Sequence, residues 1–423
     1  MVKHDQIVLP QTNLRVTMKE IKLLHKGLKK ACPDIHKVRL KALIAGVTSA
    51  ITEQQVSVTQ LGRNLRSFSK TKTKHDIKRM DRLAGNRHLH QERLDIYRHM
   101  AHTLIGHQLH PILLVDWSPI PENNQLQILR IAIPMGGRAL PILEECYPIS
   151  ELNTPWVHKL LLDDLEQILP DNCQPIFLAD AIFKTPWFES ILERNWYFAG
   201  RIRGNVQLSL NHQDWETAST VMKKATSKPS TLGEVLYGKT VQFKGQAYLY
   251  QGKIKGTHKK KKTGGISKDT GSLYYSQKAK EPWLLIAHLP ENMNTAKRVV
   301  NLYRNRMQIE EGFRDTKSPH YGLDLACSRS QSAKRYDILL LISSLALYLL
   351  WCIGKVASIK NYHRALQANT TKHRAVLSII FLGRQVINDQ RYKIKKKLLK
   401  QVMSEIWKYT ISPIDNFRLM VSA

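Results

Sequence analysis

Cysteine is scarce in this sequence, and the few cysteines form no recognisable pattern. The chain has five cysteines in 423 residues, and no two of them have the C-x-x-C spacing of a zinc or redox motif. The odd number argues against a disulfide framework, and the spacing argues against a structural zinc site. Both observations favour a protein of a reducing cytosol.

Acidic residues are also few relative to basic ones. The chain has 34 Asp and Glu against 65 Lys and Arg, which gives a net charge of +31. Such an excess destabilises a compact chain by self-repulsion and predicts a polyanionic partner. Nucleic acid is the expected partner, and an acidic membrane surface is the alternative. A ribosomal or architectural protein would share this charge, but the length favours an enzyme of two or three domains.

Membrane segments are equally scarce. The first 20 residues carry scattered charges, so we expect no secretory signal. Only residues 338–354 approach the shortest length of a membrane span, roughly 17 residues. We interpret this segment as a helix buried on all sides, with a single membrane span as the alternative. The sequence thus predicts a cytoplasmic protein with no membrane partner.

The N-terminal region is basic and has helical periodicity. Residues 1–100 contain 21 Lys and Arg against 8 Asp and Glu. Apolar spacing predicts helices within 40–47, 57–65 and 75–83, with a polar connector at 67–74. We therefore expect a helical DNA-binding domain over residues 1–105, of the helix-turn-helix type. The alternative is a basic helical cap on the next domain.

The pattern changes near residue 110 to one typical of an α/β fold. The expected strands are 112–115, 126–133, 139–143, 175–179 and 196–203, and the expected helices are 156–169 and 186–194. Gly136 and Gly137 form the turn between the second and third strands. The resulting order, β-β-β-α-β-α-β, is typical of a ribonuclease-H-like core, which we place at residues 106–203.

A β-rich insertion is expected over residues 204–282. Strand-like runs occur at 240–243, 247–250 and 272–276. The basic run at 258–262 is either a solvated surface or a contact for a phosphate backbone. Helices are expected to resume near Thr295. We place the second part of the core at residues 283–360, and a helical C-terminal region with a role in dimerisation at 361–423.

Three carboxylates stand out in this arrangement. Asp116 and Asp180 each follow a short apolar strand, where ligand sites form in α/β folds, although either one alone could be a turn residue. Glu310 lies in a predicted helix, and it shares an arc of roughly 60° with Tyr303, Arg306 and Lys317. A solvated charged face is the alternative. Three carboxylates would suit Mg²⁺, with Mn²⁺ as a substitute, while Arg306 and Lys317 would bind phosphates.

At these residues the chain resembles the bacterial insertion-sequence transposases of the DDE type that carry the signature Y-x2-R-x3-E-x6-K. The signature is complete in Tyr303, Arg306, Glu310 and Lys317, and its spacing selects Glu310 rather than the adjacent Glu311. The similarity also includes DIKRMDRLAGNRHLHQERL at 76–94, LVDWS at 114–118, LADAIFKTPW at 178–187 and AKEPWLLI at 279–286.

The resemblance implies a ribonuclease-H-like core with an insertion between the second Asp and the Glu. It also implies cut-and-paste transposition by a homodimer in a bacterial cytoplasm, in association with the nucleoid. The DNA partners would be the terminal inverted repeats and the target, and the steps would be nicking, hairpin formation and strand transfer. Trp283 would stack on a flipped base, whereas without the resemblance it would be a core aromatic. The alternative function is an inactive, transposase-derived DNA-binding repressor, which predicts the loss of a triad carboxylate, and none is lost.

Overall fold

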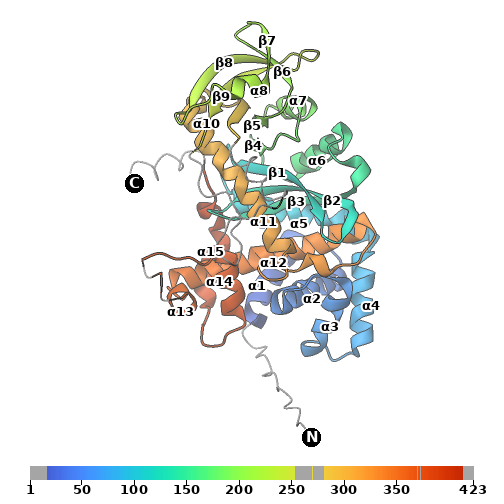
Figure 1. The fold of residues 1–423 in the computed structure, drawn as a ribbon. Helices are drawn as coiled ribbons and strands as arrows, with labels where there is room; N and C mark the ends of the chain where they lie inside the picture. Colours follow the sequence, from blue (N-terminus) through green and yellow to red (C-terminus); the bar gives the residue numbers. More distant parts are fainter. Residues whose placement is uncertain (1–16, 253–268, 270–280, 369, 372, 413–423) are drawn as a thin grey trace.

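The structure of the protein is a computed structural model, which describes residues 17–252, 269, 281–368, 370–371 and 373–412. Figure 1 shows three layers along the long axis of the molecule: a helical base, a central part of a large sheet with its covering helices, and a β lobe at the far end. The sheet has ten strands in the order β3-β2-β1-β4-β5-β10-β9-β8-β6-β7. It therefore runs from the central part into the lobe without interruption.

The central part confirms the predicted order of strands and helices. Its elements are β1 (Ile112–Ile120), β2 (Asn123–Pro134), β3 (Ala139–Pro148), α6 (Pro155–Ile168), β4 (Ile176–Ala179), α7 (Thr185–Leu192) and β5 (Tyr197–Ile202). β1 pairs in antiparallel fashion with β2 and in parallel fashion with β4. Gly136 and Gly137 both have positive φ, as the tight turn between β2 and β3 requires.

One expectation about β1 is wrong. We expected the strand to end before Asp116, but it continues to Ile120, and Asp116 pairs with Arg130 of β2. The reason is that β2 remains a hydrogen-bonding partner beyond the point where β4 ends. The last parallel pair is Val115 with Ala179. Asp116 thus lies inside a strand but at the edge of its parallel pairing.

The insertion is β-rich, as predicted, and it extends the core sheet. It contains β6 (Gln207–Leu210), β7 (Trp215–Thr217), α8 (Ala218–Met222), β8 (Ser230–Tyr237) and β9 (Phe243–Tyr250). The predicted strand at 240–243 is wrong, because Val241 is 56% exposed and Gln242 has a positive φ, so these residues form a turn before β9. The predicted features at 258–262 and 272–276 lie outside the described residues.

The helical base surrounds one long apolar helix, α12 (Ala333–Ile359). This helix is apolar enough to cross a membrane, but its most apolar window is entirely buried in the protein. The base also contains α1 (Thr17–Ala31), α2 (Lys37–Glu53), α3 (Val58–Asn64), α4 (Thr73–Ala84), α5 (Arg87–Ile105), α13 (His363–Leu366), α14 (Ile379–Ile387) and α15 (Lys396–Ser404). The structure therefore agrees with a core helix at 338–354 and with the three predicted N-terminal helices.

Glycine permits a close contact between α12 and α14 in the base. A Cβ on Gly354 of α12 would lie 1.8 Å from the carbonyl oxygen of Ile379, at the start of α14. A Cβ on Gly383 would lie 2.1 Å from the carbonyl oxygen of Leu350. Any larger residue at either position would force the two helices apart. α2 and α4 also pack against α12, so the N-terminal helices share its hydrophobic core.

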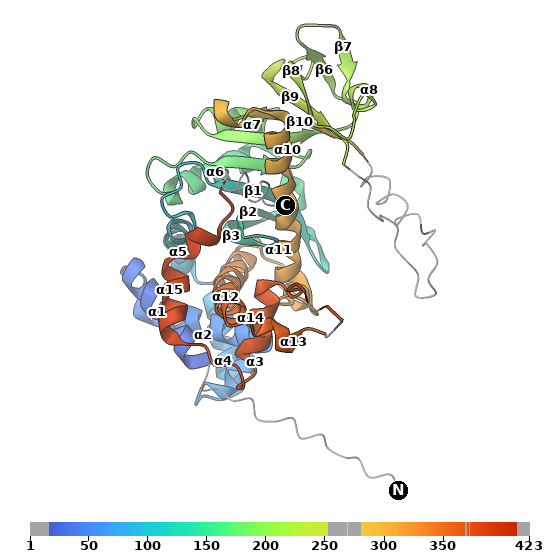
Figure 2. The same ribbon diagram turned by 90° about the vertical axis from the view of Figure 1, so that its left-hand side faces the viewer.

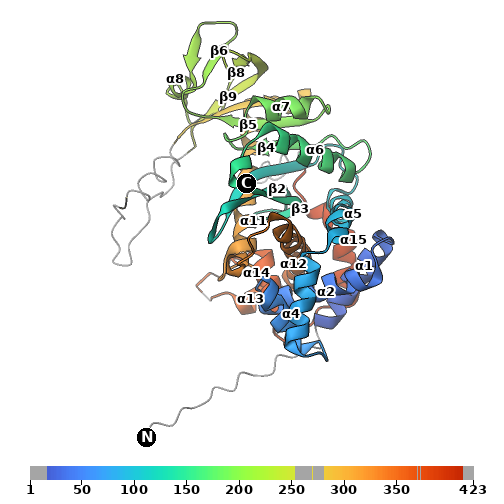
Figure 3. The same ribbon diagram turned by 90° about the vertical axis from the view of Figure 1, so that its right-hand side faces the viewer.

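A column of helices connects the β lobe with the base. It follows β10 (Trp283–His288) and consists of α10 (Ala296–Tyr303), a 3₁₀ turn (Arg304–Met307) and α11 (Gln308–Lys317). Figures 2 and 3 show this column along one side of the sheet, with α6 and α7 on the other. We expected one continuous α-helix, but the 3₁₀ turn separates α10 from α11. In this turn the side-chain amide of Asn305 donates a hydrogen bond to the backbone carbonyl of Leu302.

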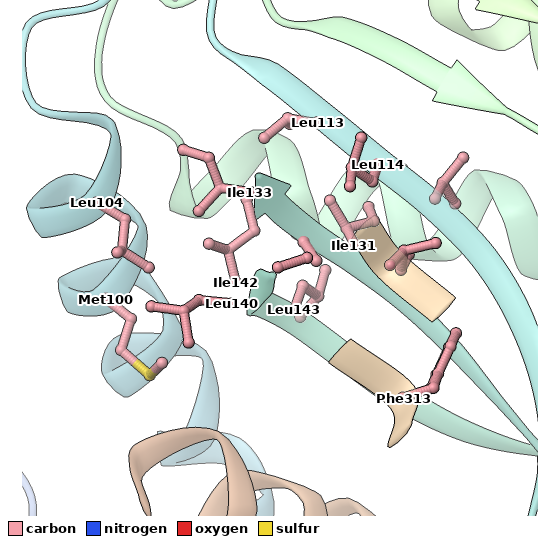
Figure 4. Packing of buried hydrophobic residues seen from close by; sticks show 14 of the residues in the cluster. Met100, Leu104, Leu113, Leu114, Ile131, Ile133, Leu140, Ile142, Leu143 and Phe313 are labelled. Carbon is pink, nitrogen blue, oxygen red and sulfur yellow. The ribbon is translucent and has the colours of Figure 1, made fainter. Parts of the chain in front are cut away.

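The core beneath β1 is continuous and apolar. Figure 4 shows side chains of α5, β1, β2 and β3 packed together, with Phe313 of α11 at the far end from Met100 and Leu104. Residues 112–115 of β1 are fully buried in this cluster. This packing fixes the strand that carries Asp116, and through Phe313 it also fixes the helix that carries Glu310.

Candidate active site

Two aspartates are brought side by side by the register of the sheet. Because Val115 of β1 is paired with Ala179 of β4, Asp116 and Asp180 follow at adjacent positions. Each carboxylate accepts a hydrogen bond from the backbone N–H of the next residue, at 2.9 Å for Asp116 and 2.7 Å for Asp180. The local backbone therefore orients both side chains at the same edge.

The guanidinium of Arg306 joins this pair to the third predicted carboxylate. Its Nη1 lies 3.3 Å from Oδ2 of Asp116, and its Nη2 lies 2.6 Å from Oε1 of Glu310. The side chain of Arg306 is only 8% exposed, whereas that of Glu310 is 48% exposed. The structure thus brings Asp116, Asp180, Arg306 and Glu310 together, with Glu310 on the solvent side.

The two aspartates differ in their affinity for protons. Burial raises the pKa of Asp116 to about 7, and the charges of Asp180 and Glu310 add to this effect against the opposing charge of Arg306. Burial acts in the same direction on Asp180, but Arg306 and the N–H of Ala181 outweigh it and hold the pKa of Asp180 below its usual value. The carboxylate charges around Asp116 thus favour a cation at this site, and Arg306 supplies one.

The donor atoms suit a hard divalent cation. All three side chains offer carboxylate oxygens, the ligands that Mg²⁺ prefers. Within the described ranges, however, no three His, Cys, Asp or Glu side chains are close enough to hold an ion as they stand. Arg306 already uses one oxygen of Asp116 and one of Glu310. The chemistry of the site therefore fits the metal, and its present geometry is closed around Arg306.

Glu310 and the adjacent Glu311 have different partners in the structure. Glu311 accepts a hydrogen bond from Arg138 at 2.8 Å and also pairs with Arg314. Arg138 belongs to the turn between β2 and β3, where Gln308 accepts a hydrogen bond from the N–H of Gly137. Glu311 therefore helps to attach α11 to the sheet, and only Glu310 faces Asp116.

Tyr303 and Trp283 connect the strand that precedes Asp180 with the insertion. Tyr303 is buried, and its hydroxyl donates to the carbonyl of Ala179 at 3.2 Å. The ring of the half-buried Trp283 lies 5.3 Å from that of Tyr303 and 5.9 Å from that of Tyr250, both edge to face. Trp283 is thus at the boundary of the core, one ring away from the residue that precedes Asp180.

Lys317 is directed toward β1 rather than toward the carboxylates. Its ammonium group donates to Oγ of Ser118 at 2.5 Å and to the carbonyl of Pro119. Burial, together with the nearby charge of Arg130, lowers the pKa of Lys317 to about 7. The ammonium group therefore lies two residues along the same strand from Asp116.

Sequence reasoning missed a pair of cations beside Asp180. Arg201 and Arg203 at the end of β5 both interact with Glu281, at 3.0 and 2.7 Å, and both lower the pKa of Asp180. Two arginines separated by one residue at a strand end point to the same face, and this spacing was the signal available in the sequence.

A group of carboxylates at the edge of an α/β sheet, in a chain with an excess of basic residues, is suited to chemistry on a polyanion. Residues 157–348 match the model of a protein family described as the transposase DDE domain. The matched segment contains Asp180 and Glu310, and Asp116 lies before it. The match supports an insertion-sequence transposase of the DDE type, which implies a DNA substrate. None of the curated proteins compared with the chain matches it.

Proposed function

We propose that this protein is a transposase that moves an insertion sequence by a cut-and-paste mechanism, with a core of the ribonuclease-H-like type. The observation that carries the proposal is the convergence of Asp116, Asp180 and Glu310 around one buried guanidinium. An inactive DNA-binding repressor would not need these carboxylates to meet. The enzyme is therefore the better account of the geometry.

The three carboxylates would hold Mg²⁺, or Mn²⁺ in its place. Two such ions would activate a water or a 3′-hydroxyl and stabilise the leaving oxygen of the cleaved phosphodiester. The backbone N–H groups that hold Asp116 and Asp180 keep both carboxylates turned toward the substrate. Arg306 is close enough to bind the phosphate beside the cut, and a guanidinium suits this role because it donates in a bidentate fashion.

Lys317 and Tyr303 would act around the same phosphate. Lys317 would bind the DNA backbone along β1, because its ammonium group lies beside Ser118. Tyr303 holds the carbonyl that precedes Asp180 through its hydroxyl. Its effect on DNA would therefore come largely through the position of Asp180.

Trp283 would support the formation of a DNA hairpin. A hairpin requires a sharply bent backbone, and extrusion of one base relieves that bend at the cost of lost stacking. Stacking on an aromatic side chain returns about 1–3 kcal/mol per base. The half-buried ring of Trp283, which lies beside Tyr303 and Tyr250, would provide this contact at the edge of the site.

The partners would be the terminal inverted repeats of the element and a target DNA. The basic helices of residues 1–105 would recognise the repeats, and residues 361–423 would support a homodimer in the DNA complex. The protein would act in a bacterial cytoplasm, at the nucleoid.

The direct test uses the full-length protein and a DNA fragment that carries the inverted repeats flanking its own gene. With Mg²⁺ we expect nicks, hairpins, an excised fragment and joined products. The Asp180→Asn variant should bind the same fragment in a gel-shift assay but produce none of them. Cleavage that persists in excess EDTA, or normal cleavage by Asp180→Asn, would refute the proposal.

A further inference from the structure

The guanidinium of Arg306 lies between two of the carboxylates that the proposed function assigns to metal binding. Nη1 is 3.3 Å from Asp116, and Nη2 is 2.6 Å from Glu310. In the part of the chain that the structure describes, the one other hydrogen-bond acceptor of the guanidinium is the sulfur of Met307, 3.3 Å from Nη2. Among the described residues Arg306 is paired with no other carboxylate, so these ion pairs are its principal interactions.

A guanidinium and a metal ion cannot use these oxygens at the same time. The Nη1 and Nη2 atoms bind Oδ2 of Asp116 and Oε1 of Glu310, and a divalent cation would need oxygens of the same two carboxylates. Both cations would also repel one another within such a small volume. Occupation of the carboxylates by Arg306 therefore lowers their affinity for metal.

We propose that Arg306 is an internal competitor of the catalytic metal ion and that a DNA phosphate releases it. This inference rests on the proposed function, because it assumes that Asp116 and Glu310 are metal ligands. A phosphate that approaches from the solvent side meets Glu310 first, since Glu310 is 48% exposed, and its ion-pair partner Arg306, which is only 8% exposed, lies directly behind it. Arginine forms bidentate contacts with phosphate as readily as with carboxylate. The guanidinium would then move from the carboxylates to the substrate.

The consequence is a coupling between DNA and metal at one residue. If DNA raises the affinity for metal by a given factor through Arg306, metal must raise the affinity for DNA by the same factor. The site would therefore bind metal poorly until an end is in place. This order would limit cleavage of DNA that has not been properly docked.

The test measures metal binding rather than cleavage. Mn²⁺ is titrated into the full-length protein without DNA, and free Mn²⁺ is followed by electron paramagnetic resonance. The Arg306→Gln variant should bind Mn²⁺ about tenfold more tightly than the wild type. Arg314→Gln is the matched control, because it also removes one positive charge from the helix column, but Arg314 pairs with Glu311. The control should change the affinity less than about twofold.

A second substitution shows where the ion is bound. Adding Asp116→Asn to Arg306→Gln should remove the gain in Mn²⁺ affinity. If Arg306→Gln is poorly folded by circular dichroism, Arg306→Lys takes its place. A single ammonium cannot bridge both carboxylates, so we expect a smaller gain of the same sign.

An unchanged or weaker Mn²⁺ affinity in the Arg306 variant would overturn the inference, and so would an equal gain in Arg314→Gln. A gain that survives Asp116→Asn would also overturn it, because the ion would then lie elsewhere. These failures are distinguishable from failure of the proposed function. In the first case the wild type still excises DNA with Mg²⁺, and in the second it does not.

Discussion

The two adjacent glutamates of α11 have different partners, and this difference predicts different effects of the same substitution. Glu310 faces Arg306 and Asp116, whereas Glu311 faces Arg138 at the turn between β2 and β3. A change of each residue to glutamine preserves its size and removes its charge. We expect Glu310→Gln to slow DNA cleavage severely and Glu311→Gln to leave it nearly intact.

The magnitudes follow from the exposure of the two side chains. Glu310 and Glu311 are 48% and 37% exposed, so loss of either ion pair should cost at most about 1 kcal/mol of folding stability. Loss of a metal ligand removes several kcal/mol of charge stabilisation in the transition state. At 1.36 kcal/mol for each factor of ten, a loss of about 4 kcal/mol slows cleavage on the order of a thousandfold.

The assay is single-turnover cleavage of an end fragment with Mg²⁺, accompanied by urea unfolding of both variants. Glu310→Gln should fold and bind ends normally while it cleaves about a thousandfold more slowly. Glu311→Gln should cleave within about threefold of the wild type, because the loss of this ion pair should raise the activation free energy of cleavage by less than about 1 kcal/mol. Equal losses in the two variants would refute the assignment of Glu310 as the third ligand.

Three further predictions concern residues around the site. Glu144 forms a fully buried ion pair with Arg130, so Glu144→Ala should cost about 3–5 kcal/mol of unfolding free energy in urea; a loss below 1 kcal/mol would contradict this. His158 accepts a hydrogen bond from the indole of Trp117, and burial lowers the pKa of His158 to about 4 from its ordinary value of 6.5. Because the unfolded chain binds this proton at a higher pH than the folded protein does, the free energy of unfolding should fall by roughly 3 kcal/mol as the pH drops from 6.5 to 4. The His158→Gln variant keeps an acceptor but does not titrate, so its free energy of unfolding in urea should lack this pH-dependent loss. Trp283→Ala should preserve nicking but slow hairpin formation about tenfold, and an abasic position near the cleaved end should partly restore it; equal loss of both steps and of soluble yield would instead indicate a core role.

Local periodicity was sufficient for most of the elements but not for their long-range pairing. The short apolar run before Asp180 ends where predicted, because β4 has no partner beyond Ala179. The strand before Asp116 extends further, since β2 continues to pair with it as far as Ile120. That partner comes from a separate part of the chain, so the residues around Asp116 alone could not reveal it.

The candidate site likewise depends partly on local spacing in the sequence and partly on contacts between distant parts of the chain. Spacing along the predicted helix identified Glu310 and placed Arg306 near it, and the structure shows both beside Asp116. The ion pairs of Arg306 depend on the 3₁₀ turn that follows α10, and a period of 3.6 residues does not reveal such a turn. The burial of Tyr303 and the contact of Lys317 with Ser118 likewise depend on where the helix column meets the sheet.

The central claim is that the carboxylates bind the catalytic metal, and a change of one ligand atom tests it most directly. In Asp180→Cys a soft thiolate replaces a hard carboxylate, and it should disfavour Mg²⁺ more strongly than Mn²⁺. The measurement is the rate of end cleavage by this variant and by the wild type, with Mg²⁺ and with Mn²⁺ in turn. The account predicts that Asp180→Cys is inactive with Mg²⁺ and regains cleavage with Mn²⁺, while the wild type is active with both. Cleavage by Asp180→Cys at the wild-type rate with Mg²⁺ would contradict it, because Asp180 would then not be a ligand of the metal.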